Sequence, residues 1–131
     1  MTDRDKKLYQ NQKMDRANAT INEISNLVQF GYYNNAINRL YYACFYAIHA
    51  LLSMNDVFPK SHKGVLQMFA LHFIKTEKIS GGMGEFYAKL FQERLLADYA
   101  DETTYTKEYV QNLLQSAKQL IGKIEVMLSE K

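Results

Sequence analysis

The segment from Tyr33 to Met54 constrains the fold of this chain more than any other. It is apolar almost all round a helical projection, as is typical of the buried central element of a helical bundle. Such a helix needs other helices packed on several of its sides. The apolar side chains that recur along the segment are Ile37, Leu40, Tyr41, Cys44, Phe45, Ile48, Leu51 and Leu52.

Amphipathic helices are predicted at both ends of the chain. The first covers about residues 5–30 and stops at Gly31, a residue that favours the end of a helix. Its apolar residues recur at steps of three and four: Met14, Ala17, Ile21, Ile24 and Val28. The last helix covers about residues 106–129, with a wide apolar stripe made of Tyr109, Leu113, Ala117, Leu120, Ile124 and Met127.

Two further helices are predicted between these. Asn55, Asp56 and Pro59 interrupt the chain after the central helix, and Ser61 can cap a helix that reaches about Lys75. The sequence Ser80-Gly81-Gly82 predicts a turn. A fourth helix then runs to about Tyr99, with Tyr87, Leu90 and Phe91 facing inward.

Composition supports an all-α fold of one domain. The 131 residues include one proline and six glycines, and 47% of them are hydrophobic. Few helix-breaking residues and short connections favour an up-and-down antiparallel bundle of about five helices. We expect a single domain over residues 1–131.

Charge and cysteine content exclude several classes of protein. The net charge of +2 is far below that of an obligate duplex-DNA binder. The single cysteine, Cys44, cannot form an intramolecular disulfide or a cysteine-based zinc cluster, and it suits a reducing cytoplasm. The polar amino terminus is no signal peptide, and the longest apolar run, Tyr41–Leu52, is shorter than the ~20 residues that cross a bilayer. We therefore expect a cytoplasmic protein without a membrane segment.

One stripe of the central helix is polar. Arg39, Tyr42, Tyr46 and His49 follow one another at steps of three, four and three. A buried guanidinium without a partner is costly, so Arg39 should meet a carboxylate, a carbonyl or a ligand. We favour a structural ion pair and a core histidine, and expect Arg39→Ala to damage folding more than binding. A ligand-facing stripe is the alternative.

The fourth helix carries an arginine in line with apolar residues. Tyr87, Phe91, Arg94 and Asp98 share one stripe. Arg94 and Asp98 are spaced as a surface ion pair of a few tenths of a kcal/mol. The alternative is that Arg94 points inward or into a contact between subunits, because solubility alone explains its position poorly.

The run Lys60-Ser61-His62-Lys63 begins the predicted third helix. Free backbone N–H groups, the helix dipole and two lysines together suit a phosphate. Local packing or capping by His62 is the plainer interpretation. The sequence contains no glycine-rich phosphate loop, no HExxH and no Cys/His metal spacing, so we expect no metal and no cofactor.

Several of these segments together resemble the HEPN domain family. The run from Ala36 to Ala47 (AINRLYYACFYA) is similar to the family core A-x-x-R-x-Y-Y-A-x-F-x-A. It is followed in order by Pro59-Lys60-Ser61-His62-Lys63-Gly64, Phe73-Ile74-Lys75-Thr76, Leu90-Phe91 and Arg94-x-x-Ala97-Asp98-Tyr99. The resemblance covers about residues 10–128 and is closest to small stand-alone members.

The resemblance implies an up-and-down helical bundle that dimerises. It also implies a minimal nucleotidyltransferase as partner, with which many members form toxin–antitoxin pairs. Toxic members are metal-independent ribonucleases, with an R-x4-6-H motif in a late helix that faces a cleft between two subunits. That chemistry needs a base for the ribose 2′-hydroxyl and a cation for the phosphate.

This sequence departs from the ribonuclease motif. Arg94 matches the arginine, but Tyr99 stands five residues later and no histidine follows Arg94. A tyrosine, with a pKa of about 10, is a poor base at neutral pH. Asp98 is no better, because the neighbouring Arg94 favours its ionised form. The departure favours a protein that is not an enzyme.

We therefore predict a homodimeric HEPN subunit that binds nucleotide or RNA and acts with a minimal nucleotidyltransferase. One alternative is a ribonuclease toxin with a non-standard active site, in which Arg94 is catalytic. The other is a helical adaptor without a nucleic-acid role. The residues predicted to contact the ligand are Arg94, Asp98, Tyr99, Arg39, Tyr42, Lys60, His62 and Lys63.

Overall fold

The structure is a computed structural model that describes residues 1–99 and 105–130; the side chain of Tyr99 lies outside this description. The described residues form helices and no strand, which confirms the all-α prediction. In chain order the elements are α1 (Asp3–Gln29), α2 (Tyr33–Ser53), α3 (His62–Phe69), the π-helical turn η1 (Ala70–Ile74), α4 (Gly81–Tyr99) and α5 (Lys107–Ser129).

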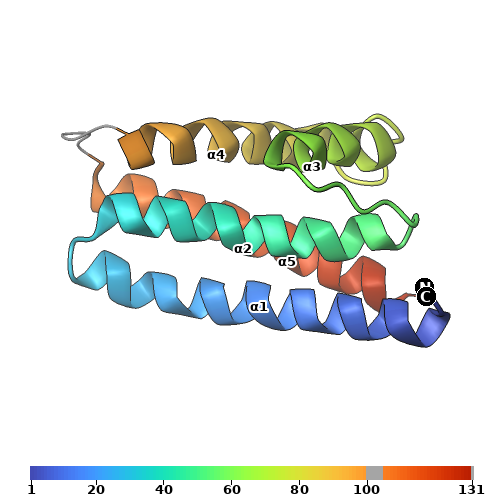
Figure 1. Cartoon of the computed structure of the whole chain (residues 1–131). Coiled ribbons are helices and arrows are strands. Elements are labelled where there is room, and N and C mark those ends of the chain that lie inside the picture. Colours follow the sequence, from blue (N-terminus) through green and yellow to red (C-terminus); the bar gives the residue numbers. More distant parts are fainter. Residues whose placement is uncertain (100–104, 131) are drawn as a thin grey trace.

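Helix α2 is the centre of the bundle and contacts α1, α3, α4 and α5. Figure 1 shows α2 and α5 in the middle, with α1 on one side and α3 and α4 on the other. The long helices α1, α2, α4 and α5 alternate in direction along the chain. The apolar side chains of α2 are buried as predicted except for Phe45, which is half-buried, and Leu40, Tyr41, Cys44 and Ile48 are each 0% exposed.

Side chains at the helix starts explain several of the boundaries. Ser61 begins α3 as predicted, and its Oγ accepts a hydrogen bond from the backbone N–H of Gly64 at 2.9 Å. Thr106 caps α5 in the same way. At the end of α1, Gly31 adopts a φ of +78°, a conformation that glycine tolerates without strain.

The turn predicted at Gly81 and Gly82 is wrong, because both glycines lie in the first turn of α4. The Oγ of Ser80 accepts a hydrogen bond from the N–H of Met83 at 3.2 Å and so acts as a cap. This capping offsets part of the cost of two helical glycines. The chain reverses earlier, where Glu77 has a φ of 60°.

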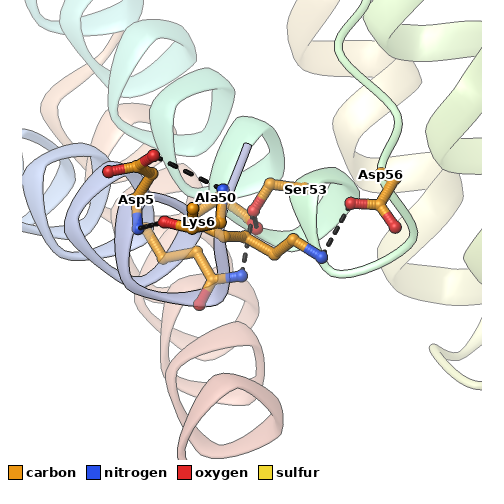
Figure 2. A network of polar contacts seen from close by, with 7 residues as sticks. Asp5, Lys6, Ala50, Ser53 and Asp56 are labelled. Atoms are coloured by element: carbon orange, nitrogen blue, oxygen red, sulfur yellow. Dashed lines mark hydrogen bonds and ion pairs between the residues drawn. The ribbon is translucent and has the colours of Figure 1, made fainter.

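Polar contacts join the start of α1 to the end of α2 (Figure 2). Lys6 Nζ lies 2.7 Å from Asp56 Oδ1, in the turn that follows α2. Deeper in the bundle, Gln10 Nε2 donates to Ser53 Oγ at 3.0 Å, and Ser53 Oγ donates to the carbonyl of Ala50 at 2.6 Å. These contacts hold the beginning of the connection that leads to α3.

Within the described residues, no helix is long and apolar enough to cross a membrane. In the same part of the chain, no three histidine, cysteine, aspartate or glutamate side chains gather as a metal site would require.

Candidate functional site

An aromatic cluster fills the contact between α2, α3 and α4, and Tyr41 lies at its centre. We call this group the Tyr41 cluster. The ring of Tyr41 is fully buried and stacks on that of Tyr87, with centroids 5.7 Å apart and an interplanar angle of 15°. The other members pack around it: Tyr42, Phe45, His62, Phe91 and Arg94.

Arg94 enters this cluster from α4. Its side chain is 14% exposed, and its Cζ lies 4.9 Å from the centroid of the Tyr41 ring. One terminal nitrogen, Nη1, lies 3.6 Å from Asp98 Oδ2. The Nε atom is buried and has no hydrogen-bond partner among the described residues. The guanidinium therefore keeps an N–H donor that none of the described residues accepts.

His62 enters the cluster from the first turn of α3. Its Nδ1 is 2.8 Å from the hydroxyl oxygen of Tyr41, and its ring stacks on Phe45 with a centroid distance of 4.5 Å. Burial lowers the pKa of His62, and the positive charge of Arg94 lowers it further. The imidazole is therefore neutral at neutral pH. Although 32 positions separate them in sequence, His62 and Arg94 contact the same tyrosine.

Asp98 is held from two helices. Its Oδ1 accepts a hydrogen bond from Asn38 Nδ2 on α2 at 3.0 Å, while Oδ2 faces Arg94. The carboxylate thus links α4 to α2 and orients the guanidinium. Lys60 and Lys63 are exposed on either side of Ser61 and His62, at the start of α3.

The polar stripe of α2 divides between two neighbours. Tyr42 meets the imidazole of His62 edge-on, with centroids 5.7 Å apart. Tyr46 instead faces α1, where the Cζ of Arg16 is 4.6 Å from the centroid of the Tyr46 ring. His49 also faces α1, with Nδ1 3.4 Å from the hydroxyl of Tyr9. Of this stripe, only Tyr42 belongs to the Tyr41 cluster.

Arg39 has the partner that was expected, but its burial was overestimated. Its Nε lies 3.4 Å from Glu23 Oε2 on α1, and its Nη2 donates to Thr20 Oγ1 at 3.3 Å. The side chain is 35% exposed, since it lies at the edge between α1 and α2. Helical periodicity identified the face but not how much of it α1 covers. Arg39 is thus engaged by α1 and not by the Tyr41 cluster.

The structure therefore brings together Arg94, Asp98, His62 and Tyr42, with Lys60 and Lys63 nearby in the chain. The predicted contact at Tyr99 lies outside the described side chains. Sequence patterns assigned Tyr41 and Tyr87 to the core and gave no sign of their hydroxyl groups' partners. Both tyrosines are 0% exposed, and a buried hydroxyl group needs a hydrogen-bond partner. That requirement could have indicated a polar network around the two hydroxyl groups.

Comparison with known proteins gives a consistent family match. The family model described as HEPN domain matches residues 11–127. A protein of Thermotoga maritima named UPF0332 protein is 30% identical over 115 residues, which cover 88% of this chain and 87% of that protein.

A second relative, from Methanocaldococcus jannaschii, carries the name "Putative toxin MJ0142". It is 32% identical over 118 residues, which cover 90% of this chain and 80% of that protein. With a family model that matches nearly the whole chain and relatives covered over most of their length, this chain belongs to the HEPN domain family.

Proposed function

We propose that this protein is a homodimeric HEPN subunit that binds nucleotide or RNA and acts with a minimal nucleotidyltransferase in a toxin–antitoxin type pair. The observation that carries the ligand part of the proposal is the environment of Arg94. Its side chain is 14% exposed, and the described residues place one carboxylate, that of Asp98, against a group with five N–H donors, so donors remain for an anion.

Phosphate is the anion that this arrangement suits best. An arginine can hold two phosphate oxygens through parallel hydrogen bonds, a geometry that lysine cannot reproduce. Asp98 orients the guanidinium from one side. Lys60 and Lys63, at the start of α3, add positive charge at the positive end of the helix dipole.

The aromatic neighbours suit the base of a nucleotide. Tyr42 is half-buried, so part of its ring is available for stacking. We also propose that Tyr99 stacks on a base or donates its hydroxyl group, as predicted from the sequence. We leave Arg39 out of the ligand site, because Glu23 and Thr20 engage its guanidinium.

The partner and the biological setting rest on family membership. The relative from Methanocaldococcus jannaschii carries the words "Putative toxin" in its name, and a toxin that is encoded in a pair requires a neutralising partner. We propose a minimal nucleotidyltransferase encoded beside this chain. Co-expression of the two should yield a stable complex. A gene without such a neighbour, or a pair that fails to associate, would favour the helical adaptor.

Arg94→Lys tests the ligand site, with Arg39→Lys as the matched control. Binding of AMP and of a labelled single-stranded oligoribonucleotide should weaken about tenfold in Arg94→Lys, a loss of roughly 1.4 kcal/mol. The control should bind as the parent does, because Arg39 pairs with α1. Circular dichroism and light scattering should be unchanged in both variants. Equal affinity of Arg94→Lys and the parent would remove Arg94 from the site.

A metal-independent ribonuclease is the second candidate function. It is favoured by the proximity of His62 to Arg94, which supplies a histidine and an arginine although no histidine follows Arg94 in sequence. We expect no cleavage of a single-stranded oligoribonucleotide in the presence of a metal chelator. Cleavage by the parent that disappears in both Arg94→Ala and His62→Ala would establish the ribonuclease instead.

A further inference from the structure

We infer that Tyr87 and Tyr41 set the tautomer of His62, so that its imidazole carries the proton on Nε2 and acts as a hydrogen-bond donor toward a phosphate oxygen. The ligand in this inference rests on the proposed function, whereas the tautomer rests on the hydrogen bonds of the Tyr41 cluster alone. Tyr41 is then a positioning residue of the site.

Two consecutive hydrogen bonds lead from the core to His62. The hydroxyl of Tyr87 is 3.4 Å from that of Tyr41, and the hydroxyl of Tyr41 is 2.8 Å from His62 Nδ1. Tyr87 is 0% exposed, and Tyr41 is its hydrogen-bond partner among the described residues. A hydroxyl group has a single proton to donate.

The donor and the acceptor of each hydrogen bond follow from the buried position of Tyr87. If Tyr41 donated to Tyr87, the buried proton of Tyr87 would be left without an acceptor among the described residues, which is unfavourable. Tyr87 therefore donates to Tyr41. The hydroxyl of Tyr41 is then free to donate its own proton to His62, and Nδ1 is the acceptor.

A neutral imidazole carries one proton, so an acceptor at Nδ1 requires a proton at Nε2. The ring is kept neutral because burial and the charge of Arg94 lower the pKa of His62. Stacking on Phe45 and the edge contact with Tyr42 hold the plane of the ring. Neighbouring residues therefore favour both the neutral form of the imidazole and the orientation of its ring.

This tautomer decides what His62 can do beside Arg94. An Nε2–H group donates to an anionic oxygen but cannot accept the proton of a ribose 2′-hydroxyl. Two donors, His62 and Arg94, then converge on Tyr41, which holds the first by its hydroxyl and the second by its ring face. The arrangement favours phosphate binding over base-catalysed cleavage.

Nitrogen-15 NMR of the full chain with labelled histidine measures the tautomer directly. At neutral pH we expect His62 to show an unprotonated Nδ1 and a protonated Nε2, with His62→Gln used to assign the signals. Tyr41→Phe should shift the population away from this tautomer, because the donor to Nδ1 is lost. The control Tyr109→Phe removes a hydroxyl bonded to Glu93 and should leave His62 unchanged.

Two results would overturn the inference: a parent protein with its proton on Nδ1, or a Tyr41→Phe variant that folds and keeps the parent tautomer. Should Tyr41→Phe fail to fold, the parent spectrum still decides, because the inferred protonation pattern is a property of the unmodified protein. Circular dichroism establishes which of these cases applies.

Titration of the labelled protein then tests the ligand. Inorganic phosphate, AMP and a short single-stranded oligoribonucleotide distinguish a phosphate site from a nucleotide or RNA site. We expect the Nε2 signal of His62 to shift on binding and the affinity to fall about three- to tenfold in Tyr41→Phe. His62→Gln, whose amide N–H replaces Nε2–H, should bind better than His62→Ala.

The two proposals fail separately. If His62 has the inferred tautomer but none of the three compounds binds, the proposed function is wrong and the assignment of the tautomer remains. If binding depends on Arg94 but the Nε2 signal does not move, His62 is not a donor to the ligand and only the further inference fails.

Discussion

The guanidinium of Arg94 lies over the ring of Tyr41, with its Cζ 4.9 Å from the ring centroid. This contact joins α4 to α2 through a cation and the negative face of an aromatic ring, an interaction of about 0.5–2 kcal/mol. Together with Asp98, the ring restricts the rotamers of Arg94 before a ligand arrives. Less conformational entropy is then lost on binding.

Arg94→Met should separate stability from binding. Methionine keeps an unbranched apolar stem against Tyr41 while it removes a charge that is only 14% exposed. Asp98 is 32% exposed and keeps its hydrogen bond from Asn38, so water can solvate its carboxylate once the guanidinium is gone. We therefore expect a melting temperature within a few degrees of the parent. Binding of the oligoribonucleotide should fall by about tenfold or more. A large loss of stability would show that Arg94 is mainly structural.

Arg39→Ala should be mild. A surface ion pair contributes about 0–1 kcal/mol, and the Arg39 side chain is 35% exposed where it meets Glu23. We therefore expect urea denaturation to show a loss of about 1 kcal/mol, well below the roughly 3–5 kcal/mol of a broken buried pair. Glu23→Gln removes the charge of the other partner and should lower the free energy of unfolding by no more than Arg39→Ala does. A loss of several kcal/mol in either variant would contradict this account.

Ser53→Ala should destabilise the bundle. Its hydroxyl is buried, accepts a hydrogen bond from Gln10 and donates to Ala50. Without it the amide of Gln10, which is 4% exposed, loses its partner, at a cost of about 1–3 kcal/mol. Ser129→Ala is the control, because Ser129 makes the same local bond to a carbonyl on an exposed turn. Equal melting temperatures of the two variants would refute this role of Ser53.

Stability should depend on pH through His49. Burial, with smaller contributions from the charge of Lys13 and from His62, lowers the pKa of His49 from 6.5 to about 4. Between pH 6.5 and 4 the unfolded chain therefore binds more protons at this position than the folded chain, so stability falls as the pH falls through this window.

His49→Gln isolates this contribution from that of the carboxylates and of His62. The melting temperature of the parent should drop more between pH 7 and pH 5 than that of the variant, because glutamine does not titrate. Parallel pH profiles of the two proteins would show that His49 does not contribute.

We expect a homodimer in solution. Ten tyrosines and seven phenylalanines are a large aromatic surface for 131 residues, and the described surface exposes Phe30, Tyr32 and Leu96 by more than half. Light scattering at micromolar concentration should give a mass about twice the 15.3 kDa of one chain. A mass of one chain would contradict the prediction.

The sequence by itself determined the helices and their buried faces. The step of three and four from Met14 to Val28, and the apolar surround of Tyr33–Met54, predict α1 and α2 to within two residues at each end. Local periodicity is enough to predict a helix and its buried face, because the apolar face is buried whichever neighbouring helix packs on it. The same reasoning failed at Gly81 and Gly82, where the hydroxyl of Ser80 supports a helix that composition alone disfavours.

Only the tertiary structure decided what the polar side chains meet. Periodicity assigned Arg39 to the inside of the bundle, but its exposure depends on how far α1 covers that edge of α2. His62 and Arg94 lie on different helices, and no spacing in the sequence indicates that both contact Tyr41. A helical period gives the direction of a side chain about its own axis, whereas its partners depend on how the helices pack, which is set by the volumes of all the buried residues together.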